Sequence, residues 1–139
     1  MTMRNSGTSS PVEPVRHLSV DEVVAIHARM LERFGGTPGL SDPGLLESAL
    51  FRPQTGHYGD VVAIGAALLE SLLINRPFDD GNTRTAFFAV DVFLRMNGRQ
   101  IRADAQAAHR SLVELIEGRS ADLKRLEPWL RQYTVKMHR

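Results

Sequence analysis

The stretch Arg76-Pro-Phe-Asp-Asp-Gly-Asn-Thr-Arg-Thr-Ala-Phe87 joins two strongly apolar segments and decides the fold. The segment before it, from about 60 to 75, is apolar around most of its helical circumference, which is typical of a central, buried helix. Pro77 prevents this helix from continuing. A second helix is expected to start near Asn82 and to end at 97–98, where Asn-Gly supplies a stop signal. The sequence therefore predicts two consecutive central helices joined by a short polar turn.

Two further helices are expected on the amino-terminal side of this pair. Ser19, followed three residues later by Glu22, forms the capping-box pattern, and helical spacing of apolar residues then predicts a helix from about 20 to 34. His27 lies near the apolar stripe of that helix and is interpreted as a core or boundary histidine. A short helix opens at 42–43, where Asp-Pro supplies a cap and a first-turn proline, and it stops before the next proline.

The carboxy-terminal part predicts a helix from about 104 to 117 and a last one that begins near Asp122. Pro128 is expected to interrupt or restart that last helix. No segment alternates with period two for long enough to predict a convincing strand. The fold class is therefore all-α, a single bundle of about six helices. A small loop or hairpin flap is expected in the Pro- and Gly-containing stretch 52–59.

Composition limits the classes of protein that this chain can be. Its 139 residues are enough for one domain, and we expect residues 1–16 to form a flexible tail before a domain that spans 17–139. The net charge of +1 argues against binding to nucleic acid through bulk phosphate attraction. No apolar run approaches the roughly 18 residues that a membrane helix needs. Cysteine is absent, which excludes disulfides and is compatible with a reducing cytoplasm. From the charge and the lack of a long apolar run we expect a soluble, cytoplasmic protein with no nucleic-acid partner and no membrane contact.

The turn between the two central helices carries the chemistry. It would present backbone N–H groups at the start of a helix, where the helix dipole also favours an anion. Gly81 lets a ligand approach closely, and Arg84 can add a charge-assisted contact to phosphate. Asp79 and Asp80 suit a divalent cation that bridges a carboxylate and phosphate oxygens. A structural alternative is open at this point, since the same residues resemble a helix-capping turn in which Arg84 pairs with Asp80.

The turn closely resembles the signature of the Fic/Doc family, in which His-Pro-Phe-x-Asp-Gly-Asn is followed by a variable residue, then by arginine and often by Thr-Ala. The residues that match this signature are Pro77, Phe78, Asp80, Gly81, Asn82, Arg84, Thr85 and Ala86. The stretch 39–50, with Arg52-Pro53 after it, is similar to the entry region of Doc-type proteins, and 93–98 is similar to their helix end. The likeness extends over roughly residues 17 to 133.

Several properties follow from this resemblance. Members of the family transfer part of a nucleotide to a protein hydroxyl, either AMP or, for Doc toxins, the terminal phosphate of ATP onto elongation factor Tu. ATP and magnesium are thus the implied cofactors, and an antitoxin protein is an implied partner. By similarity, Asp80 binds magnesium, while Gly81, Asn82, Thr83 and Arg84 bind phosphate. Phe87 occupies the position of the second arginine of AMP-transferring members, which places the chain nearer to Doc.

Arg76 is the main departure from the family pattern, because it occupies the position of the histidine that acts as general base. A guanidinium stays protonated and cannot accept that proton, so the resemblance implies an impaired enzyme. Arg76 can result from an inactivating change, can be natural in a non-catalytic relative that binds nucleotide or a protein partner, or can accompany altered chemistry. The resemblance also places the target-docking flap at 52–59, where His57 and Tyr58 could contact substrate.

Overall fold

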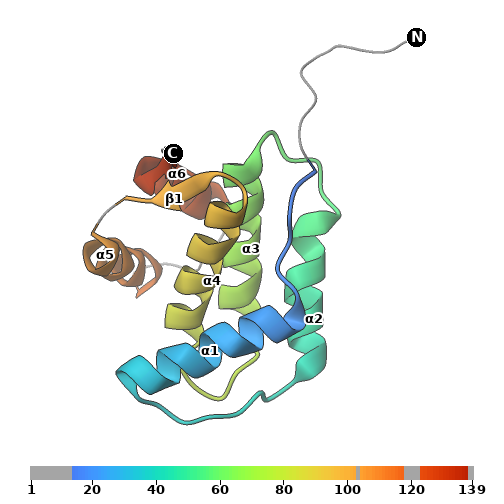
Figure 1. Cartoon of the computed structure of the whole chain (residues 1–139), viewed down its shortest axis with the longest axis vertical. Coiled ribbons are helices and arrows are strands. Elements are labelled where there is room, and N and C mark those ends of the chain that lie inside the picture. The colour runs from blue at the N-terminus through green and yellow to red at the C-terminus, as the bar shows by residue number, and fades with distance from the viewer. Residues whose placement is uncertain (1–13, 103, 118–122, 138–139) are drawn as a thin grey trace.

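The computed structural model describes residues 14–102, 104–117 and 123–137. Within these ranges the chain forms helices that pack around α3 and α4, with one small two-stranded sheet at the edge (Figure 1). In chain order the elements are α1 Val20–Phe34, α2 Pro43–Phe51, the 3-10 turn η2 Arg52–Gln54, α3 Val61–Asn75, α4 Asn82–Met96, β1 Arg99–Ile101, α5 Ala105–Glu117, α6 Leu123–Tyr133 and β2 Thr134–Lys136. The all-α fold class predicted from the sequence is confirmed.

Helix α3 is the centre of the core. It packs against α4, α6 and α2, and most of its residues are buried, as the apolar circumference of the segment predicted. Asp60 accepts a hydrogen bond from the N–H of Ala63 at 2.9 Å and so caps the first turn. The aromatic rings of Phe87 and Phe93 on α4 are almost fully enclosed in the same core. The loop that connects α3 and α4 therefore starts and ends on two closely packed helices.

Helix α1 lies across the end of the α3–α4 pair where the loop is found (Figure 1). Ser19 and Glu22 form the predicted capping box, each accepting a hydrogen bond from the backbone of the other. The buried face of α1 carries Val23, His27 and Met30. The expectation that His27 lies in the core or at its boundary is therefore confirmed, since only 5% of its surface is exposed.

Short strands complete the fold. β1 and β2 pair antiparallel, with Arg99 opposite Lys136 and Ile101 opposite Thr134. Each strand has three residues, too few to show an alternating pattern in the sequence. An isolated antiparallel bridge also joins Leu40 to Phe78. The stretch 52–59 contains η2 followed by an irregular loop, so of the two forms expected there the described structure has the loop.

The expected break at Pro128 does not occur. Helix α6 runs through this proline without interruption. A proline inside a helix removes one hydrogen bond and costs about 3 kcal/mol, so other contacts must offset that cost. Leu126, Trp129 and Leu130 are buried on the two sides of Pro128, and the indole of Trp129 also donates to the hydroxyl of Ser111 at 3.1 Å. This anchoring overrides the local preference to end the helix.

In the described part of the chain, none of the helices has the length and apolar character needed to span a membrane.

Candidate functional site

The loop between α3 and α4 begins with a sharp reversal at Arg76. This residue has φ 43° and ψ 62°, in the left-handed region that costs most side chains roughly 1–2 kcal/mol. Its N–H donates to the carbonyl of Leu72 at 3.1 Å and closes the last turn of α3. Pro77 follows and cannot continue the helix. The side chain of Arg76 is exposed beside the loop, and among the described residues it forms no ion pair.

The segment 36–41 runs beside the loop and holds its outer side. The carbonyl of Pro77 accepts from the N–H of Ser41 at 2.8 Å, and the N–H of Asp79 donates to the carbonyl of Gly39 at 3.0 Å. Gly39 has φ 141°, and a Cβ at this position would collide with the carboxylate of Asp79. The close approach of the two segments therefore requires glycine here.

Phe78 and Asn82 fix the inner side of the loop. The ring of Phe78 is buried, with 4% exposed, and Asn82 is buried to almost the same extent. The side chain of Asn82 accepts from the N–H of Phe78 at 2.9 Å and donates to its carbonyl at 2.8 Å. Because both ends of this amide are occupied, the Asn82 side chain serves the shape of the loop. Any contribution of Asn82 to phosphate binding would come from its backbone N–H.

Asp80 presents an exposed carboxylate that backbone groups hold in place. One oxygen accepts from the N–H of Thr37 and the other from the N–H of Gly81, each at 2.9 Å. These two hydrogen bonds, with a smaller electrostatic contribution from His27, lower the pKa of Asp80 below its ordinary value. Asp80 is therefore ionised at neutral pH. Each oxygen keeps a free lone pair on the solvent side, as a metal ligand requires.

The first turn of α4 has unsatisfied donors. Gly81 is the N-cap residue, with φ 75°, and no side chain caps the helix. Within the described part of the chain, no acceptor is found for the N–H groups of Asn82, Thr83 and Arg84. These three groups point out from the positive end of the helix dipole. In a helix-capping turn, the loop's own residues would accept hydrogen bonds from these N–H groups. Since the loop residues do not, the arrangement favours an anion at this position.

The guanidinium of Arg84 does not pair with Asp80, which removes the second part of the structural alternative. It lies over the ring of Phe34, 3.9 Å from the centroid. Together with Phe88 and His109, these two residues line an open hollow between α1, α4 and α5. The charge of Arg84 and burial both lower the pKa of His109, with burial the larger cause. Arg84 is thus a charged group next to the free N–H groups, available to a phosphate.

The loop residues suit a magnesium–nucleotide complex better than a metal bound by protein ligands alone. No three side chains among His, Cys, Asp and Glu gather to hold a metal within the described ranges. Magnesium usually takes one or two carboxylates and completes its shell with water and phosphate oxygens. Asp80 supplies such a carboxylate, beside the free N–H groups of α4. The other acid in the loop, Asp79, accepts a hydrogen bond from the hydroxyl of Ser41.

His57 and Tyr58 are not brought to this site. They lie between η2 and the start of α3, whereas the loop follows the end of α3. A helix of 15 residues is about 22 Å long, and Figure 1 shows the two connections at opposite ends of it. The segment that borders the loop is 36–41. The structure therefore does not bring His57 and Tyr58 together with the other predicted site residues.

Sequence reasoning missed the residues around the loop that shape it. Thr37 and Ser41 donate to the two aspartates, and His27 donates to the carbonyl of Asp80 at 2.8 Å. Two signals were present in the sequence. A histidine on an apolar helix face needs a polar partner, and the glycines at 35, 36 and 39 mark a segment in which backbone approaches another group closely.

Comparison with known proteins agrees with this geometry. The model of the Fic/DOC family matches residues 17–94, more than half of the chain. The "Protein kinase doc" of Escherichia phage P1 is 36% identical over 91 residues, which cover 63% of this chain and 72% of that protein. The "Toxin Doc" of Mycolicibacterium smegmatis is 41% identical over 97 residues, which cover 65% of this chain and 74% of that protein. The chain is therefore a member of the Fic/DOC family.

Proposed function

We propose that this chain is a Doc-like toxin of a toxin–antitoxin pair, whose site binds ATP with magnesium for transfer of a phosphoryl group to a protein hydroxyl. The two curated relatives named above support the toxin assignment, and the name of the phage protein supports a kinase. The observation that carries the proposal is the set of three N–H groups in the first turn of α4 for which the described residues offer no acceptor, beside the ionised carboxylate of Asp80.

In this proposal each residue of the loop has one task. Asp80 binds magnesium, which when present neutralises charge that develops on the transferred group. The N–H groups of Asn82, Thr83 and Arg84 bind phosphate oxygens, and Gly81 admits them without a clash. The guanidinium of Arg84 turns from the ring of Phe34 toward the phosphate. Phe87, buried in the core, supplies no second arginine, which favours phosphoryl transfer over AMP transfer.

Arg76 makes the site incomplete for catalysis. Position 76 lies exposed where α3 ends, next to the phosphate-binding turn, so a histidine there would reach a substrate hydroxyl beside the phosphate. Histidine is also one of the residues enriched in the left-handed conformation that this position adopts. Arginine keeps the positive charge but cannot act as a base. The proposed toxin is therefore catalytically impaired: it is expected to bind nucleotide but to transfer phosphate slowly.

The antitoxin is proposed because both relatives are Doc proteins and one is named a toxin, and the target is proposed from the family resemblance. An antitoxin is expected to bind the toxin, and elongation factor Tu is the proposed target. Since His57 and Tyr58 lie at the far end of α3, target docking is proposed along the segment 36–41, which borders the loop.

The test is the replacement Arg76→His. Restoring a positioned general base is expected to raise phosphoryl transfer from ATP to elongation factor Tu by about 10²–10⁴-fold, because that is the usual contribution of such a group. Transfer is measured with radiolabelled ATP, and toxicity by growth after induction. The double variant Arg76→His, Asp80→Asn is the control and is expected to be inactive. If Arg76→His neither modifies any protein nor arrests growth, the toxin proposal fails.

A non-catalytic binding module is the second candidate, and the exposed guanidinium at position 76 favours it. In that case the chain binds nucleotide or a partner without the help of Asp80. Isothermal titration of ATP with and without magnesium separates the two. Magnesium-dependent binding that Asp80→Asn abolishes supports the toxin site, whereas partner binding that is indifferent to that change supports the module.

A further inference from the structure

His27 is a buried polar side chain that the proposed chemistry does not use. It lies on α1, 53 residues before Asp80 in sequence, and the residue is only 5% exposed. Its Nε2 lies 2.8 Å from the carbonyl oxygen of Asp80. Since a carbonyl oxygen can only accept, Nε2 must carry the hydrogen. The carbonyl oxygen of Asp80 is thus the hydrogen-bond partner that a buried imidazole requires.

The same ring touches two other residues of the loop. It stacks on Phe78 with centroids 3.8 Å apart and the planes only 9° from parallel. It also lies close to Gly81, where an added Cβ would be 3.9 Å from Nε2. One rigid side chain from α1 thus contacts the loop at Phe78, at Asp80 and at Gly81.

The bond to Asp80 has a consequence for the direction of the carboxylate. In a trans peptide unit the C=O and the following N–H point in opposite directions and share one plane. Because His27 holds the carbonyl of Asp80 toward α1, the N–H of Gly81 is turned away from α1. That N–H donates to the carboxylate of Asp80 at 2.9 Å. The orientation of the proposed magnesium ligand is therefore tied to His27 through one peptide plane.

We propose that His27 is a positioning residue of the site, which sets the direction of the Asp80 carboxylate and of the N–H groups that follow it. The role resembles that of an outer partner in a metal site, which orients a ligand without touching the metal. The magnesium–nucleotide part of this inference rests on the function proposed above. The part that concerns loop geometry does not, and it can be tested in the free protein.

The first test is amide hydrogen exchange by NMR in the protein without ligand. His27→Phe keeps an aromatic ring over Phe78 but removes the donor to Asp80. The N–H groups of Gly81 and Thr37, which both donate to the Asp80 carboxylate, are then expected to exchange about tenfold faster, the effect of one ordinary hydrogen bond. His27→Gln restores an N–H donor at similar reach and is expected to bring exchange back close to that of the unchanged protein.

Met30→Ala supplies the matched control. Met30 is buried on the same helix, next to Val92 of α4, which lies about 15 Å along that helix from Asn82. Because Met30 shares a hollow with Val92 and none of the loop residues lines it, this change is expected to loosen α1 away from the loop, so exchange at Gly81 and Thr37 should rise only as far as global stability falls. Equal protection of these two N–H groups in His27→Phe and in the unchanged protein would overturn the proposal. So would an equal loss in Met30→Ala.

The second test is isothermal titration with magnesium and a non-hydrolysable ATP analogue. His27→Phe is expected to weaken binding by roughly 10–100-fold, as is usual when the outer partner of a ligand is lost. His27→Gln should recover most of the affinity, and Met30→Ala should keep it. If the unchanged protein binds no nucleotide, the proposed function fails while the exchange experiment still decides the role of His27. If it binds and His27→Phe binds equally well, the positioning role fails.

Discussion

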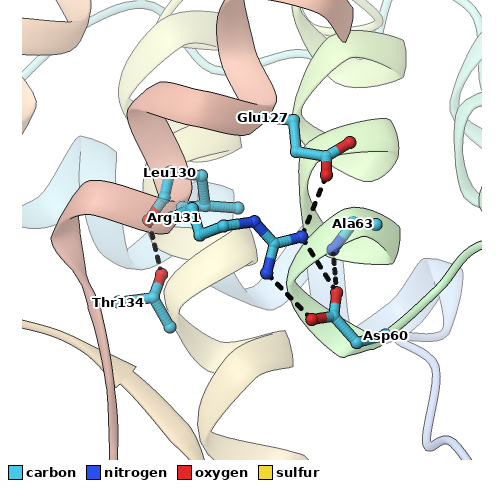
Figure 2. A network of polar contacts seen from close by, with 6 residues as sticks. All are labelled: Asp60, Ala63, Glu127, Leu130, Arg131 and Thr134. Atoms are coloured by element: carbon cyan, nitrogen blue, oxygen red, sulfur yellow. Dashed lines mark hydrogen bonds and ion pairs between the residues drawn. The ribbon is translucent and has the colours of Figure 1, made fainter.

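The two ends of helix α3 use charged residues in opposite ways. At its amino-terminal end, Arg131 of α6 donates two hydrogen bonds to Asp60, at 2.8 and 3.1 Å, and one to Glu127 at 2.9 Å (Figure 2). Asp60 also caps the helix through the N–H of Ala63. At the carboxy-terminal end, Arg76 and Asp80 lie in one short loop without forming an ion pair.

This difference distinguishes a carboxylate that is paired within the protein, that of Asp60, from one that has no paired cation among the described residues, that of Asp80. The pKa of Asp60 is lowered chiefly by its hydrogen bonds to the Arg131 guanidinium. The pKa of Asp80 is lowered chiefly by the N–H groups of Thr37 and Gly81. Both carboxylates are ionised, yet Asp60 is already paired with a cation, which it shares with Glu127. No cation among the described residues pairs with Asp80, so its carboxylate is available to bind one.

The largest expected effect is on magnesium-dependent nucleotide binding. Asp80→Asn removes the negative charge while keeping the shape of the side chain, and it should weaken binding of the magnesium–ATP analogue complex by at least about tenfold, since it removes a proposed direct ligand. Asp60→Asn makes the same chemical change at the other end of α3 and should leave the affinity unchanged. Isothermal titration of both variants checks this. If Asp80→Asn and Asp60→Asn bound the complex with equal affinity, the two ends of α3 would not differ in the way described above.

Stability should respond in the reverse order. Asp60→Ala removes the cap of α3, worth about 0.5–2 kcal/mol. It also removes an exposed ion pair, worth about 0.2–1 kcal/mol. Urea denaturation is expected to show a loss of about 1–2 kcal/mol in the free energy of unfolding.

Asp80→Ala serves as the matched change, and it should cost less stability than Asp60→Ala because the carboxylate of Asp80 caps no helix and pairs with no cation. A larger loss in the free energy of unfolding for Asp80→Ala would show that the Asp80 side chain stabilises the fold more than the Asp60 cap of α3 does.

Whether a feature could be predicted from the sequence depends on how far apart the contacting residues are along the chain. The capping box at Ser19, the central character of α3 and the position of the turn between α3 and α4 all follow from neighbours within a few residues, so periodicity and local motifs were sufficient. Arg131 pairs with a residue 71 positions earlier, and His27 with one 53 positions later. No local pattern encodes such partners, because they are set by how the helices pack.

The same reason explains what the sequence left open or predicted wrongly. The sequence did not show that 52–59 and the loop lie at opposite ends of α3, because the order of segments in the chain does not reveal which end of a helix each connection reaches. Pro128 was expected to break α6, because local propensity ignores the burial of Trp129 and Leu130 on either side. The strands β1 and β2 each have three residues and depend on each other across more than 30 positions. Such a pair leaves no periodic signal in the sequence.

The smallest expected effect concerns acid and salt. A carboxyl whose pKa is lowered in the folded protein stabilises the fold at pH values above its unfolded pKa, and this contribution is lost as the pH falls through the folded pKa. For Asp60 the window therefore lies below its ordinary value of 3.8. Because its side chain is 44% exposed and the pair is screened by solvent, the contribution is only about 0.2–1 kcal/mol. Asp60→Asn should flatten the acid limb of the stability curve by that amount.

Salt should then distinguish the two carboxylates. At 1 M salt the screening length falls to about 3 Å, which weakens attraction between exposed charges but changes hydrogen bonds from backbone N–H groups much less. In an NMR titration, the pKa of Asp60 should rise toward its ordinary value as salt is added, while the pKa of Asp80 stays low. Equal movement of both would mean that Asp80, too, is held by a cation. The carboxylate at the loop would then already be neutralised, and its availability to magnesium would lose its physical basis.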